Sequence, residues 1–222
     1  MPDRAQVAVW DLPIRLFHWT LAALIAFSWW TATTGHLEWH LYSGFGICSL
    51  ILFRLLWGVF DSSTARFTNF VRGPRAVAAY LKDQSTWRLP GHTPLGALSV
   101  VALLVAVAVQ VALGMFAQDD DGLVFGPLAT LVSSDTSDRI REIHGIWFWV
   151  LIALIVLHIA AIVYYKFIGR QPLTKAMLTG TADLSDAAEP TQRGKYWVAL
   201  ICLVAGIALT RWIIAGVPPF GG

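Results

Sequence analysis

Two histidines stand in one apolar stretch, REIHGIWFWVLIALIVLHIAAIVYY, which runs from Arg141 to Tyr165. His144 and His158 are fourteen residues apart. At about 100° and 1.5 Å per residue they fall on one face of a helix, about 21 Å apart along its axis. An imidazole in hydrocarbon is costly unless its nitrogens have partners. The spacing therefore indicates two separate sites at two depths of a membrane.

Two further histidines lie at the matching depths of other apolar runs. His18 is near the start of the first run, at the level of His158, and His40 opens the second run at the level of His144. A pair of imidazoles at one depth supplies both axial ligands of a six-coordinate haem b, and the porphyrin fills apolar space between helices. The histidines therefore predict two non-covalent haem b groups, one at each level.

Other uses of buried histidines compete with this interpretation. A proton relay without a metal usually needs carboxylates inside the membrane, and none lies deep in any apolar run. A zinc ion needs a compact tetrahedral cluster, and the two levels are too far apart for one. Cys48 and Cys202 belong to no C-x-x-C or C-x-x-C-H pattern, which argues against zinc and against covalent haem. We therefore favour haem b.

Two histidines are left out of the predicted ligand set. His36 lies four residues before His40 and competes with it, but His36 follows Gly35 before the second apolar run is established. We therefore prefer His40. His92 stands among turn formers in Pro90–Pro94 and is expected at the surface.

Three residues near the predicted ligands have two interpretations each. Gly44, one turn after His40, leaves room for a porphyrin or serves helix packing. Arg54, fourteen residues after His40, shares its face and is expected to pair with haem propionates or to snorkel to lipid headgroups. Arg15, one turn before His18, has the same two roles open to it. Gln110 is expected to bridge helices.

The composition is that of an all-α membrane protein. The chain has 222 residues, of which 56% are apolar and 14% charged, whereas soluble domains carry about a quarter charged residues. Its mean hydropathy is +0.61. A bilayer core needs about 20 apolar residues per helix. Five segments meet this requirement: Ile14–Thr34, Leu41–Phe60, Leu95–Phe116, Ile143–Phe167 and Tyr196–Ala215.

We predict that the first four segments form a transmembrane haem-binding four-helix bundle within residues 1–180. Residues 181–222 are expected to be a linker and an additional C-terminal transmembrane helix. The connection before the second segment holds Glu38 and no Lys or Arg, and the loop after the third holds five Asp. The connections after the second and fourth segments are basic: Arg66, Arg72, Arg75, Lys82, Arg88, Lys166, Arg170, Lys175, Arg193 and Lys195. The positive-inside rule then places the N-terminus in the cytoplasm and the C-terminus in the periplasm of a bacterial inner membrane, with His144 at the outer level.

Several longer motifs resemble the bacterial cytochrome b561 family. These are VWDLPIRLFHW at Val9–Trp19, HLYSGFGICSLILFRLLWG at His40–Gly58, GHTPLGALSVVALL, EIHG at Glu142–Gly145 and MLTG at Met177–Gly180. The family includes the cytochrome b subunits of nickel–iron hydrogenases, the membrane subunit of formate dehydrogenase, and superoxide oxidase. The resemblance implies haem ligands at the positions that depth and spacing select: His18, His40, His144 and His158.

The predicted function is that of a dihaem cytochrome passing electrons between a periplasmic redox partner and membrane quinone. The partner is expected to be a c-type cytochrome or a hydrogenase-like subunit, and no nucleic-acid partner is expected. One alternative is a superoxide oxidase acting alone, for which Arg139 and Arg141 supply positive charge, although five acidic residues nearby oppose it. Another is a haem-free transporter or assembly subunit. No acid–base pair or activated nucleophile stands out, so we predict no catalytic side chain.

Overall fold

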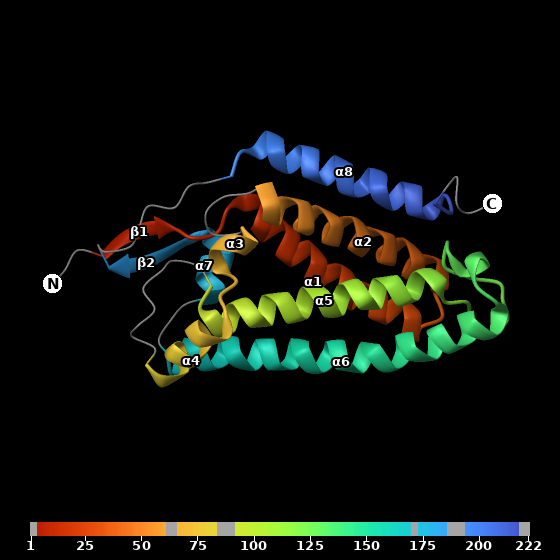
Figure 1. Cartoon of the computed structure of the whole chain (residues 1–222), viewed down its shortest axis with the longest axis horizontal. Coiled ribbons are helices and arrows are strands. Elements are labelled where there is room, and N and C mark those ends of the chain that lie inside the picture. The colour runs from red at the N-terminus through yellow and green to blue at the C-terminus, as the bar shows by residue number, and fades with distance from the viewer. Residues whose placement is uncertain (1–3, 61–65, 84–91, 170–172, 186–193, 218–222) are drawn as a thin grey trace.

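Five long helices run side by side in the computed structural model (Figure 1). It describes residues 4–60, 66–83, 92–169, 173–185 and 194–217. Each of the five helices is long and apolar enough to cross a bilayer, so the expected spans are confirmed. The helices are α1 (Leu12–Thr33), α2 (Leu37–Phe60), α5 (Pro94–Phe116), α6 (Ser134–Phe167) and α8 (Tyr196–Ile214).

Polar residues at the helix starts set where three of these helices begin. The Asp11 side chain accepts a hydrogen bond from the Ile14 amide, and the Thr93 hydroxyl accepts one from the Gly96 amide. Ser133 caps α6 in the same way, through the Thr136 amide. This cap explains why α6 starts nine residues before the expected Ile143: its first turns are polar and extend the helix beyond the apolar run.

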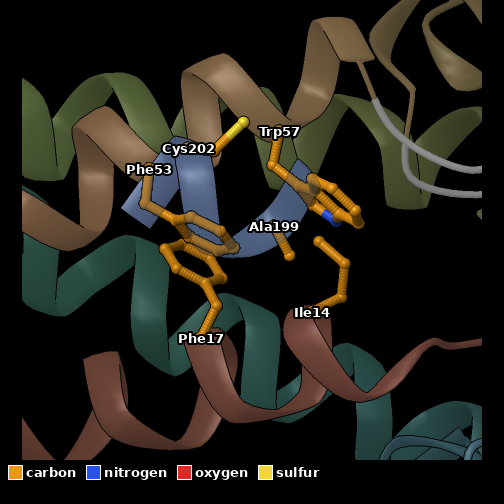
Figure 2. Packing of buried hydrophobic residues seen from close by; sticks show 6 residues of the cluster. All are labelled: Ile14, Phe17, Phe53, Trp57, Ala199 and Cys202. Atoms are coloured by element: carbon orange, nitrogen blue, oxygen red, sulfur yellow. The ribbon is translucent and has the colours of Figure 1, made fainter. Parts of the chain in front are cut away.

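Helix α2 is central in the bundle. It packs against α1, α5 and α8, while α5 pairs with α6. One apolar cluster joins α1, α2 and α8 (Figure 2), and consists of Ile14, Phe17, Phe53, Trp57, Ala199 and Cys202. A second cluster joins α2, α5 and α6, and consists of Ile47, Ile51, Ala106, Val107 and Leu151. The fifth helix is thus packed on the bundle through a face of α2.

Close contact between α2 and α8 depends on Gly206. A Cβ at this position would lie 2.8 Å from the Ser49 carbonyl oxygen and 3.0 Å from the Phe53 nitrogen. Beside it, the Ser49 hydroxyl donates to the Thr210 hydroxyl at 3.0 Å. Small residues of this kind let two membrane helices approach closely.

We expect Gly206→Leu to separate α8 from α2, because the added side chain meets backbone atoms that cannot move aside. Overpacking of this kind costs about 1–3 kcal/mol. Thermal unfolding of the purified protein in detergent measures the loss. Ala208→Leu introduces the same side chain two residues later, at an exposed position on α8, and is the matched control. Equal melting temperatures for the two variants would contradict this view of the interface.

Small elements gather at one end of the bundle, which we call the sheet end. They include a two-stranded antiparallel sheet of β1 (Arg4–Ala8) and β2 (Thr181–Ser185), in which Ala8 pairs with Thr181. The short helices α3 (Phe67–Phe70), α4 (Pro74–Lys82) and α7 (Leu173–Thr179) lie there too (Figure 1). The opposite end, which we call the loop end, carries residues 117–133 with a short 3₁₀ helix at Ala129–Leu131.

The two terminal motifs of the family resemblance meet at the sheet end. The carbonyl of Gly180 accepts hydrogen bonds from the amides of Val9 at 2.8 Å and Trp10 at 3.1 Å. Gly180 has a φ of 85°, and a Cβ there would lie 2.7 Å from the Trp10 carbonyl oxygen, so only glycine fits. The division after residue 180 stays a prediction, although β2 immediately beyond it pairs with the N-terminal strand.

Candidate haem sites

At the loop end, His40 of α2 faces His144 of α6. Their ring centroids are 6.1 Å apart and their planes are nearly perpendicular, at 86°. Two imidazoles that share one metal ion each contribute a metal–nitrogen bond of about 2 Å, which places their ring centres about 6 Å apart. The observed separation therefore fits a pair of axial ligands. His36, by contrast, is exposed and lies against Trp30.

Hydrogen bonds orient both rings of the loop-end pair. Nδ1 of His40 donates to the Ser28 carbonyl, and Nδ1 of His144 donates to the Gln110 carbonyl, each at 3.0 Å. The side-chain amide of Gln110 also approaches Nε2 of His144, at 3.2 Å, so Gln110 bridges α5 and α6 as expected. With the proton on Nδ1, Nε2 is the acceptor nitrogen in each ring, which is the form that binds a metal.

A cavity adjoins the loop-end pair. It has a volume of about 540 Å³ and is lined mainly by apolar groups from α1, α2, α5 and α6, together with His40 and His144. Gly44 borders open space, since a Cβ there would have no neighbour within 4 Å. A large apolar cavity with a few placed polar groups suits a porphyrin. Of the two roles left open for Gly44, room for a porphyrin fits the geometry better, and it stays a prediction.

We expect Gly44→Leu to reduce the haem content by about one per chain, because its side chain would project into the cavity, where a Cβ meets no other protein atom within 4 Å. The melting temperature of the haem-free protein should change little. The ratio of haem to protein, measured by absorption, checks this. Val59→Leu adds bulk on the same helix at a 60% exposed position and should retain all haem. Unchanged haem content in Gly44→Leu would show that the cavity is not the haem pocket.

At the sheet end, His18 of α1 faces His158 of α6. Their ring centroids are 6.5 Å apart, with 50° between the planes. Nδ1 of His158 lies 3.4 Å from the Ser99 hydroxyl. Nδ1 of His18 is buried and has no hydrogen-bond partner among the residues that the structure describes. The structure thus brings the four predicted ligands together as two pairs at two depths, while their role as haem ligands stays a prediction.

The two arginines also lie at the sheet end. The Arg54 side chain is only 3% exposed, and its guanidinium lies 4.5 Å from the centre of the Phe67 ring. It therefore does not snorkel to a lipid headgroup. Arg15 donates to the carbonyl of Leu178 in α7, which ties the start of α1 to that helix. Pairing of either arginine with haem propionates stays a prediction.

The expectation for His92 was wrong. Its ring lies between Trp10 and Phe70, with centroids 4.5 and 4.6 Å away, and its Nδ1 is buried. Burial, with smaller contributions from the charges of Arg54 and His158, lowers the pKa of His92 to about 3, so the ring is neutral at physiological pH. The turn formers around His92 are typical of a surface loop, which is why the sequence suggested exposure. The aromatic residues that cover the ring come from distant parts of the chain, so the local sequence does not indicate them.

Within the described part of the chain, no three or more His, Cys, Asp or Glu side chains form a metal-binding cluster. A haem with two axial imidazoles needs only a pair of protein ligands. The donor sets present in the two sites are therefore suited to haem iron, whose other four ligands come from the porphyrin.

A comparison with protein families agrees with this chemistry. The model described as prokaryotic cytochrome b561 matches residues 9–180, a range that holds α1 to α7 and both histidine pairs and leaves out α8. No curated protein and no solved structure gives a match. The family binds b-type haem, and with five apolar helices the chain is a multi-pass membrane cytochrome that takes part in electron transfer. The chain belongs to the prokaryotic cytochrome b561 family.

Proposed function

We propose that the chain binds two b haems, one in each histidine pair, and passes electrons across the membrane between a periplasmic redox protein and quinone. The observation that carries this proposal is the placing of two matched pairs, with ring centroids 6.1 and 6.5 Å apart, along the single helix α6. A haem in each pair supplies a one-electron couple.

The protein's own part is to hold and orient the two haems and to keep water away from the space between them. Imidazoles from two different helices grip each site, so His40 and His144 fix α2 against α6 at one level and His18 fixes α1 against α6 at the other. The fourteen residues between His144 and His158 separate the two levels by about 21 Å. Apolar side chains between the levels exclude water and ions, which confines the electron to the two sites.

We propose that the sheet end faces the cytoplasm of a bacterium and the loop end its periplasm. Exposed cations at the sheet end support this orientation: Arg66, Arg72, Arg75, Lys82, Lys166, Lys175 and Lys195. Arg88, Arg170 and Arg193 lie outside the described residues. At the loop end, exposed Asp121 lies next to the Asp120–Arg141 ion pair and favours a partner with a basic docking face, for which we propose a c-type cytochrome or a hydrogenase-like subunit.

A second candidate function is superoxide oxidation by the chain alone. Arg141 favours it, because this residue lines the loop-end cavity and places a cation beside the histidine pair. Its guanidinium is paired with Asp120 at 2.6 Å, however, which offsets the charge that would attract an anion. Rapid mixing with superoxide discriminates the two candidate functions. Fast haem reduction supports the oxidase, and slow reduction supports electron transfer between a periplasmic redox protein and quinone.

The proposal is tested by the haem content and the electron transfer of the purified protein. We expect two haems b per chain, both reduced by a quinol in detergent or both oxidised by a quinone after chemical reduction. Wild-type protein with one haem or none would refute the dihaem proposal. Two haems that exchange no electrons with either form of quinone would leave the dihaem part in place and refute the quinone part.

A further inference from the structure

The Nδ1 atoms of the four paired histidines have unequal partners. At the loop end, both Nδ1 atoms donate to backbone carbonyls, those of Ser28 and Gln110, at 3.0 Å, and the Ser28 hydroxyl also lies 3.0 Å from Nδ1 of His40. At the sheet end, Nδ1 of His158 has a single hydroxyl, that of Ser99, at 3.4 Å. The buried Nδ1 of His18 has no partner in the described part of the chain. The loop-end rings are therefore the more strongly hydrogen-bonded pair.

This difference changes how well each pair stabilises oxidised iron. When a carbonyl accepts the Nδ1 proton of a ligand histidine, the ring becomes a more basic ligand. A more basic ligand stabilises the more positive, ferric state and so lowers the reduction potential. Hydrogen bonds to the ligands are one of the protein's main means of setting a haem potential. A hydroxyl at 3.4 Å is beyond the usual hydrogen-bond distance and does much less.

The burial of the ligand histidines does not favour the opposite order of the two reduction potentials. The four ligand histidines are all half-buried. Both pairs lie within one bundle of apolar helices, with one histidine of each pair on α6. The hydrogen bonds at Nδ1 are therefore the feature of the ligands that separates the two sites.

We propose that the carbonyls of Ser28 and Gln110 give the loop-end site a lower reduction potential than the sheet-end site, so that electrons move spontaneously from the loop end to the sheet end. Ser28 and Gln110 are then positioning residues that act through His40 and His144. This inference rests on the proposed function, because it needs a haem in each pair. It also adds a direction, which the family membership alone does not give.

The direction identifies a donor and an acceptor by class. A reduced one-electron carrier at the loop end gives up one electron in each encounter. A quinone at the sheet end takes up two electrons in turn, together with two protons from the water at that end, and leaves as quinol. Electrons and protons then balance with two oxidised carriers for each quinol formed.

Redox titration of the haem absorption bands tests the order of the two potentials. We expect two one-electron steps in the wild type, at least about tenfold apart in their equilibrium constants, which is about 59 mV. His144→Ala should retain only the step at higher potential, and His158→Ala only the step at lower potential. The sites are about 21 Å apart, so loss of one haem perturbs the other little.

The reverse assignment, or two steps that coincide, would overturn the inference while leaving the proposed function in place. A single haem in the wild type would instead refute the proposed function. The two failures are therefore distinguishable in one experiment.

Ser99 offers a second test of the mechanism. Ser99→Asn replaces a weak acceptor by a carboxamide oxygen that reaches further towards Nδ1 of His158. We expect this change to lower the sheet-end potential by about 59 mV, equivalent to a tenfold change, without moving the loop-end step. Ser99→Ala removes only the long contact and should move neither step appreciably. A Ser99→Asn protein with both haems and unchanged potentials would show that the Nδ1 partners do not set the order.

Discussion

His144→Ala is expected to remove one haem from each chain and leave the other in place. In the proposed arrangement the ring of His144 is one of two protein ligands at the loop end, and alanine would leave His40 to hold the iron alone. The sheet-end pair stands about 21 Å away along the same helix and makes no use of His144. The haem-to-protein ratio should therefore fall from about two to about one, as measured by absorption of the purified variant.

His36→Ala is the matched control for this experiment. His36 lies four residues before His40, is exposed and contacts Trp30, so its removal should retain both haems. Retention of two haems in His144→Ala would show that this histidine is no ligand. Loss of both haems would show that the two sites are not independent, contrary to the proposed arrangement of two pairs about 21 Å apart along α6.

The spans and the two levels of the histidines were predictable from the sequence, because each depends only on local periodicity and on position within an apolar run. A helix has a fixed rise and rotation per residue, so the separation of His144 and His158 follows from counting. The depth of His18 and His40 follows from their positions at the ends of apolar runs. No knowledge of which helices are neighbours was needed to place the four residues at two levels.

Features that depend on contacts between distant segments were not predictable in this way. The strands β1 and β2 are five residues each and are separated by most of the chain, so nothing local marks them as partners. Burial of Arg54 depends on α3, a single helical turn whose Phe67 covers the guanidinium. The same is true of His92, whose neighbours Trp10 and Phe70 come from two other segments.

Contacts at the sheet end join residues of the first and the last of the quoted motifs. Asp11 caps α1, and Arg15 contacts the carbonyl of Leu178, which belongs to the last of the motifs. Gly180 accepts hydrogen bonds from the backbone of Val9 and Trp10. Residues at the two ends of the family match thus hold each other in place at the sheet end, beside the histidine pair of α1 and α6.

Trp57→Ala is expected to cause the largest loss of stability among single substitutions in the apolar cluster that joins α1, α2 and α8. Trp57 is 0% exposed and stacks on Phe53, with ring planes 14° apart. It lies among residues of α1 and α8, including Ile14 and Ala199 (Figure 2). Alanine would leave a cavity where three helices meet. We expect a cost of about 3 kcal/mol, at the lower end of the range for soluble cores, because lipid also solvates apolar groups.

Thermal unfolding of the purified protein should show this loss as a fall in melting temperature of roughly 6–12 °C. Trp57→Phe retains most of the contact area and removes an indole N–H that has no hydrogen-bond partner among the described residues. Since a buried unpaired donor is itself unfavourable, the phenylalanine variant should lose much less stability than the alanine variant. Trp197→Ala, at a position that is 60% exposed on α8, should leave the melting temperature nearly unchanged. If Trp57→Ala and Trp197→Ala had the same melting temperature, α1, α2 and α8 would not be joined through this side chain. The packing of the fifth helix on the bundle would then have to be attributed to its other contacts with α2, such as those at Gly206 and Thr210.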